Sequence, residues 1–232
     1  MARLIFDKET ERQYETGVFD GALFPWNAVG VCGKGVPWNG LTNVTEAPSG
    51  AEFTPIYADS KKYADLPSAE QFGATIEAFT YPDEFGVCDG SVEIAPGVIL
   101  GMQSRRGFCM AYKSYLGNAV EHTDYGYKQH LMFGAKVSPS EKAYVTVGDS
   151  PEAITFSWTV TTTPASLAGF KPSSILTINS TKVDPAKLKL LDDILYGTAS
   201  SDARFPSLEE VQSIFVDAAP GALTISTIVP AD

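Results

Sequence analysis

The side chains that could do chemistry in this sequence are few and widely spaced. His122 and His130 are its two histidines, and neither lies in an H-E-x-x-H pattern that would hold zinc. On one extended strand, two residues eight positions apart are separated by about 26 Å, too far to share a metal ion. We therefore expect surface or strand-face histidines and no metal site.

Three carboxylates, Asp83, Glu84 and Asp89, cluster within residues 81–90. Paired carboxylates can act as general acid and base or bind Ca²⁺. Here their order does not match a calcium-binding loop, and the stretch is rich in turn-forming residues. We expect a solvated acidic turn, with an enzyme that uses these three residues as an alternative. No G-x-S-x-G nucleophile motif is present.

The glycines at 30, 33 and 35 superficially resemble a phosphate-binding loop. The G-K-[ST] ending is absent, and Pro37 and Gly40 follow where such a loop needs a helix. We expect a loop here, with no nucleotide and no other cofactor.

The three cysteines, Cys32, Cys88 and Cys109, are widely spaced and include no C-x-x-C pair. This pattern indicates neither a zinc site nor a disulfide framework, so we expect reduced, mostly packed thiols. The N-terminus lacks the apolar stretch of a signal peptide. We expect synthesis and folding in a cytoplasm.

The chain is acidic, with a formal net charge of −11 and an isoelectric point near 4.6. An acidic surface repels phosphate, so a protein that grips nucleic acid through Lys and Arg is disfavoured. A surface that DNA slides past without adhering stays possible. The 44% of hydrophobic residues is enough for a packed core.

Alternation of apolar and polar residues predicts half-buried antiparallel strands through most of the chain. The clearest is Ile154–Thr161, where apolar residues alternate with threonine and serine. Further strands are expected at 71–78, 131–137, 143–147 and 223–229.

Two helices are predicted late in the chain. Asp184-Pro185 is a helix start and Gly197 an end, while Ser207–Glu210 forms a capping box. The sequence thus predicts a single domain over residues 1–232, with a mainly β core and a helical appendage at 184–216.

The stretch from Gly30 to Gly50 is rich in glycine and proline. A run of this length without regular structure is unusual inside a compact domain, so we expect a functional loop or arm that a partner orders.

Several stretches of the sequence together resemble the major tail protein family of long-tailed bacteriophages, and the resemblance extends over roughly residues 12 to 215. The stretches are Tyr57–Ala64, Ser68–Phe85, Cys88–Gly90, Gly107–Asn118 and Ile154–Pro164.

This resemblance implies an antiparallel β-sandwich or barrel of the tail tube type, with one or two short flanking helices. It implies a structural virion protein, not an enzyme, that forms hexameric rings stacked around a tape measure protein. Implied partners are other copies of the chain and the tail terminator and tail tip or initiator proteins. The tube would be assembled in the host cytoplasm and would pass DNA during viral genome ejection, without binding a membrane as a monomer.

Under this interpretation, Gln71, Thr75 and Glu77 are candidates to face the lumen, as the polar side of one strand. The loops Gly30–Gly50 and Asp59–Leu66 are candidates for ring-to-ring contact. Their candidate contact residues are Lys34, Trp38, Asn43, Lys61, Lys62 and Tyr63.

The alternative is a carbohydrate- or host-receptor-binding β-sandwich module. In that module Trp26, Trp38 and exposed tyrosines would stack on sugars. It predicts a soluble monomer or trimer with glycan affinity, whereas the tail tube interpretation predicts rings or tubes.

Overall fold

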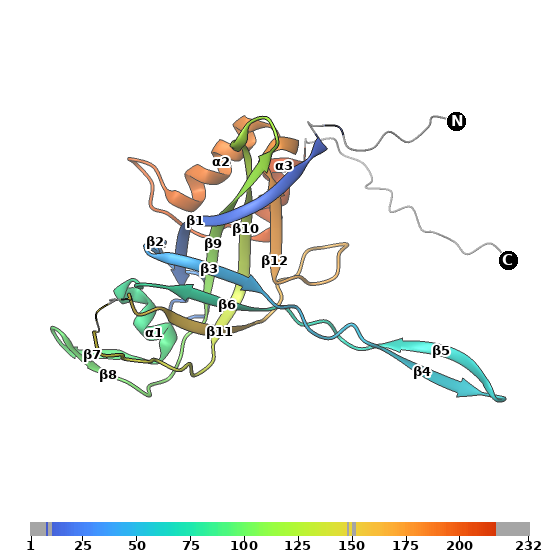
Figure 1. Ribbon diagram of the computed structural model, residues 1–232, viewed down its shortest axis with the longest axis horizontal. Coiled ribbons are helices and arrows are strands. Elements are labelled where there is room, and N and C mark those ends of the chain that lie inside the picture. The colour runs from blue at the N-terminus through green and yellow to red at the C-terminus, as the bar shows by residue number, and fades with distance from the viewer. Residues whose placement is uncertain (1–7, 9–10, 148, 150–151, 217–232) are drawn as a thin grey trace.

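The computed structural model describes residues 8, 11–147, 149 and 152–216 (Figure 1). Strands make up 47% and helices 15% of the chain, and the sheets are antiparallel, so the protein is mainly β as predicted. The strands are β1 (Gln13–Pro25), β2 (Val36–Pro37), β3 (Leu41–Glu46), β4 (Phe53–Ala58), β5 (Lys61–Pro67), β6 (Gly73–Ala78), β7 (Val92–Ala95), β8 (Val98–Leu100), β9 (Phe108–Asn118), β10 (His122–Val137), β11 (Phe156–Thr162) and β12 (Ile175–Asn179). The helices are α1 (Gly86–Asp89), α2 (Pro185–Tyr196) and α3 (Leu208–Phe215).

One sheet of eight strands forms the body, in the order β2-β1-β9-β10-β11-β6-β3, with β12 also paired to β10. The long strand β10 joins two halves of this sheet, one with β1, β9 and β12 and the other with β11, β6 and β3. Residues 122–135 of β10 pair with β9, residues 128–132 pair with β12, and its end, 135–137, pairs with β11. It bends at Gly134, where φ is +60° and a Cβ would lie 2.2 Å from the Thr163 carbonyl oxygen. Glycine is therefore required at the corner where the sheet curls.

The curled sheet has a hydrophobic core on each side. The first core lies between the two halves and includes Leu23 and Met110 from one half and Ile76 and Trp158 from the other. Alternating burial along β6 and β11 confirms the predicted strands there.

The second core lies between the other face of the sheet and the two late helices, which pack across it (Figure 1). Leu191 and Leu195 of α2 and Val211 of α3 are buried there. The predicted helix starts are confirmed: Asp184 Oδ1 accepts from Ala186 N at 2.8 Å, and Ser207 Oγ accepts from Glu210 N at 3.2 Å. The helices cover one face of the main sheet, which ties them closely to the body.

The expectation of an irregular run from Gly30 to Gly50 is wrong. The stretch contains β2 and β3, and β3 pairs with β6 inside the main sheet. Trp38, between these strands, is 3% exposed and donates its indole N–H to the Thr80 carbonyl oxygen at 3.0 Å.

The prediction of a strand at 143–147 is wrong: the sequence alternates there, but these residues pair with no described strand. The predicted strand at 223–229 lies outside the described residues and stays a prediction. Cys32 and Cys109 form a disulfide, so the expectation of reduced thiols is wrong for this pair. Cys88 is packed as predicted, and burial raises the pKa of its thiol to about 12.

Candidate assembly surfaces

A long hairpin made of β4 and β5 projects from the body as an arm (Figure 1). It continues the β3–β6 ladder, because Ser49 and Gln71 exchange two backbone hydrogen bonds of 2.8 Å at its base. Its tip is a two-residue turn in which Asp59 and Ser60 both have positive φ. Positive φ at both central residues defines the type I′ turn that favours a twisted hairpin.

The arm has no core of its own. All residues of β4 are exposed, as are all but one of β5, among them Phe53, Tyr57, Leu66 and Tyr63, which is 75% exposed. An isolated two-stranded hairpin is only marginally stable in water. An arm with these exposed rings is therefore suited to being covered by a partner.

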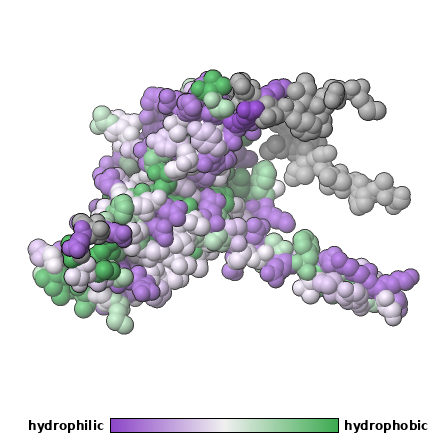
Figure 2. Space-filling model, viewed as in Figure 1, coloured by the Kyte–Doolittle hydropathy of each residue, from purple (hydrophilic) through white to green (hydrophobic). Residues whose placement is uncertain are grey.

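A second exposed apolar surface lies at the opposite end of the molecule, on the β7–β8 hairpin. Ile94, Ile99 and Leu100 are exposed there, and Met102 just beyond is 99% exposed. Hydrophobic side chains gather at this end in Figure 2. We call these residues, with Val92 and Val98, the hairpin patch.

The segment 143–147 adds exposed Tyr144, Val145 and Val147. The residue before it, Lys142, pairs with the buried Asp89 at 2.6 Å, which fixes the start of the segment beside α1. Since α1 leads directly into β7, this segment begins close to the hairpin patch.

The solvent face of β3, β6 and β11 is polar and nearly free of charge. Thr75 lies between Thr45 and Thr159 in one row, and Glu77 lies between Asn43 and Ser157 in the next. This face carries no Lys or Arg within the three strands.

The structure places the predicted lumen candidates at two positions. Thr75 and Glu77 lie together on the polar face, whereas Gln71 lies at the base of the arm. Asn43, predicted in a loop, also lies on the polar face and donates to Glu77 Oε2 at 3.1 Å.

Among the predicted contact residues, Lys61, Lys62 and Tyr63 lie on the arm, in β5 and not in a loop. Lys34 lies elsewhere and pairs with Asp202 at 2.7 Å. Trp38 is buried, so its assignment as a contact residue is wrong.

The three carboxylates of residues 81–90 do not form a joint site. Asp83 and Glu84 are exposed, whereas Asp89 is buried and paired with Lys142, against the expectation of a wholly solvated turn. A general acid and base pair would need two carboxyls facing one cavity.

The structure also contains a polar cluster that was not predicted, formed by Glu46, Ser114 and His130. His130 lies 3.0 Å from Ser114 Oγ through Nε2 and 3.4 Å from Glu46 Oε1 through Nδ1, and its ring stacks on Tyr112. The hydrogen bond from His130 holds the pKa of the Glu46 carboxyl below its usual value; burial opposes this shift, and the bond from the Tyr112 hydroxyl assists it.

Hydroxyl, imidazole and carboxylate in this order also occur in nucleophilic catalysis. Here the cluster ties β3, at the root of the arm, to β9 and β10 in the other half of the sheet. No spacing rule would have found it, because the three residues come from strands far apart in sequence.

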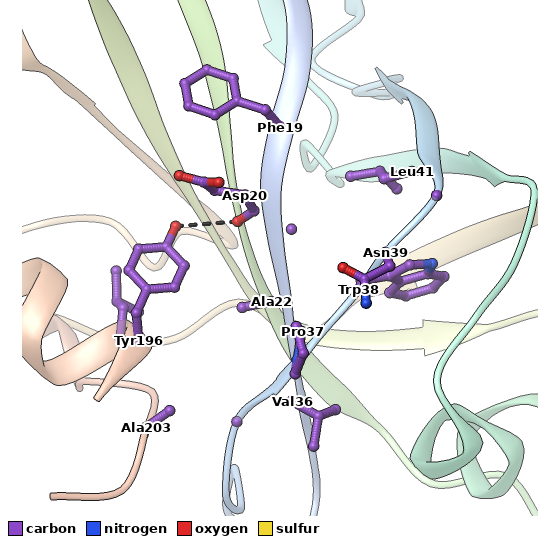
Figure 3. Close-up of a pocket in the computed structure, with 14 residues that line it drawn as sticks. Phe19, Asp20, Ala22, Val36, Pro37, Trp38, Asn39, Leu41, Tyr196 and Ala203 are labelled. Atoms are coloured by element: carbon purple, nitrogen blue, oxygen red, sulfur yellow. Dashed lines mark hydrogen bonds between the residues drawn. The ribbon is translucent and has the colours of Figure 1, made fainter. Parts of the chain in front are cut away.

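A hollow of about 460 Å³ lies beside β1 and the end of α2 (Figure 3). Tyr196 points into it and donates its hydroxyl to the Asp20 carbonyl oxygen at 3.2 Å. The nearby ammonium of Lys113 is buried between the Tyr127 and Tyr196 rings and lies 3.4–3.5 Å from Asp192 and Asp20. These polar groups pair with one another beside the hollow.

Within the described residues, no group of three or more His, Cys, Asp or Glu side chains could hold a metal ion. No helix in that part of the chain is long and apolar enough to span a membrane. No model of a known protein family matches the sequence, and a search of curated proteins finds no match.

Proposed function

We propose that this protein is the repeating subunit of a bacteriophage tail tube, a structural protein without enzymatic activity. Copies join into rings, six to a ring by the sequence resemblance, and the rings stack around a tape measure protein. The finished tube conducts DNA.

The observation that carries this proposal is a pair of exposed surfaces at opposite ends of one chain (Figure 1): the arm, with its exposed Phe53, Tyr57, Tyr63 and Leu66, and the apolar hairpin patch. Two different surfaces that bind each other make a head-to-tail contact, which generates closed rings or open filaments. A free monomer rarely exposes so much apolar surface without a partner for it.

The polar face of β3, β6 and β11 supports the second part of the proposal. A channel for DNA needs a wall that offers no cations to phosphate. Threonine, serine and asparagine with one glutamate meet this need, and so does the net charge of −11. We assign Thr75 and Glu77 to this wall.

The sugar-binding alternative is weakened at its two tryptophans, although exposed tyrosines such as Tyr57, Tyr63 and Tyr144 remain. Trp38 is in the core, and Trp26 is half-buried, packed against Gly107 with Lys136 over its ring.

Removal of the arm tests the proposal. Replacing residues 50–70 by Asn-Gly joins Ser49 to Gln71 through a two-residue turn and keeps the β3–β6 ladder. We expect a folded monomer that no longer forms rings or tubes, measured by circular dichroism and sedimentation velocity. Polymers from this variant equal to those of the full chain would contradict the proposal.

The control is the substitution Lys189→Gln on the exposed side of α2, away from both assembly surfaces. This variant should still assemble, because it leaves the arm and the hairpin patch unchanged. Deleting residues 31–45 would be a poor test, because it removes β3 and Trp38 from the body.

A further inference from the structure

An apolar groove of about 660 Å³ lies between β12 and α3, away from both assembly surfaces. Leu176 and Ile178 of the strand and Val211 and Phe215 of the helix line it. Large exposed apolar surfaces mark sites at which another segment or molecule binds.

The outer edge of β12 is open beside this groove. Phe133 N–H donates to the Ser174 carbonyl oxygen at 2.8 Å, so in this antiparallel ladder the even-numbered residues of β12 bond to β10. The odd-numbered residues then point their backbone groups outward. The Ser173 hydroxyl donates to the Ile175 carbonyl oxygen at 2.9 Å. The N–H and C=O of Thr177 have no partner among the described residues.

The chain itself leads into the groove. Val216, the first residue after α3, lines it in an extended conformation. Lys187 Nζ donates to the Phe215 carbonyl oxygen at 3.1 Å, which places the end of α3 beside the start of α2. Because α2 follows β12 closely, the chain leaves α3 near the C-terminal end of β12 and can return along that strand antiparallel to it.

The sequence after Val216 has the features of an added strand. Pro220-Gly221 is a turn signal, and Leu223, Ile225 and Val229 share one face of an alternating segment. Residues 217–222 can span up to about 20 Å. Because β12 is only about 17 Å long for five residues, this linker is long enough to bring residue 223 to the edge of β12.

We propose that residues 223–229 of the same chain add an antiparallel strand to the outer edge of β12. Leu223, Ile225 and Val229 fill the groove, and the backbone of Thr177 gains its hydrogen bonds. The added strand shields an edge that would otherwise pair with other chains. This inference does not depend on the proposed function.

Amide hydrogen exchange tests this proposal on the full-length chain at low protein concentration, so that contacts between copies do not affect the result. In the chain that keeps its C-terminus, the Thr177 amide is protected. In a chain that ends at Val216, it exchanges about tenfold faster or more, as expected for an edge that opens locally. The Met110 amide in β9 stays protected in both chains and shows that the fold is intact.

A double variant, Leu223→Asp with Ile225→Asp, should expose Thr177 as the truncation does. The matched control, Thr224→Asp with Ser226→Asp, alters the other face of the segment and should leave Thr177 protected. Equal exchange of Thr177 with and without residues 217–232 would overturn the proposal. Protection that appears only as the protein concentration rises would overturn it too, because the strand would then come from a second copy.

Discussion

Glu46 links the root of the arm to the opposite half of the sheet, and its pKa is lowered chiefly by the hydrogen bond from His130. A carboxyl whose pKa is lower in the folded state stabilises the fold above its unfolded pKa. That contribution is lost as the pH falls through the folded pKa.

We therefore expect the melting temperature to fall between about pH 5 and about pH 3, and Glu46→Gln to make this fall smaller. Thermal melts followed by circular dichroism at the two pH values measure the difference. Glu141→Gln, at an exposed glutamate, is the control and should leave the fall unchanged. A Glu46→Gln variant with the same pH dependence as the parent would show that the pKa shift contributes nothing to stability.

Gly134 forms the corner of β10, with positive φ and no room for a Cβ. Gly134→Ala should lower the free energy of unfolding by about 2–3 kcal/mol, from backbone strain together with the clash against Thr163. Gly97→Ala is the matched control: φ there is +77°, but nothing lies within 4 Å of the new Cβ.

Gly97→Ala should lower the free energy of unfolding by only about 1 kcal/mol, from backbone strain alone. Urea denaturation gives both values. Equal losses of unfolding free energy in Gly134→Ala and Gly97→Ala would contradict the proposed clash between the new Cβ and Thr163.

Residue-level prediction succeeded where one strand decides the environment and failed where two distant segments meet. The alternation at 71–78 predicts correctly that Ile76 is buried and Thr75 is not, because side chains alternate across a strand. Trp38 lies among glycines and prolines with no periodic neighbours, so only the folded sheet reveals that it is core. The Cys32–Cys109 disulfide joins residues 77 apart and follows no spacing rule.

At the scale of elements, we expect substitutions in the hairpin patch to change assembly without changing the stability of the fold. Ile94→Glu with Ile99→Glu places charge on exposed positions, so stability should change by no more than about 0.5 kcal/mol per site. Ring or tube formation should be lost, because the patch would no longer bury apolar surface.

The control is Leu190→Lys, an equally apolar and exposed position on α2, which should assemble normally. Sedimentation velocity gives the assembly state of each protein. Loss of assembly in both variants, or in neither, would contradict a specific role for the patch.

Among the elements, strands with a strict period and helices with caps could be predicted from the sequence. The arm could not, because Pro55 interrupts β4 and both faces of the hairpin are exposed, so burial imposes no alternation. At 143–147 the error is the opposite one, because a strand was predicted where none forms. Its alternation is real, but no described strand pairs with it, and pairing is a property of the whole fold.

At the scale of the whole molecule, the proposed function gives a partner to each of two exposed surfaces, the arm at one end and the hairpin patch at the other. The acidic charge, which disfavours binding to nucleic acid, suits a wall along which DNA moves. Sequence composition could show the charge, but only the sheet shows that Thr75 and Glu77 share a face with the polar residues of β3 and β11.

The most direct test of self-assembly is negative-stain electron microscopy of the purified full-length protein over a range of concentrations. The proposed function predicts six-fold rings with a central hole, or tubes built from them, and their absence from the variant without the arm. Compact monomers at every concentration, with no ring or tube, would contradict it.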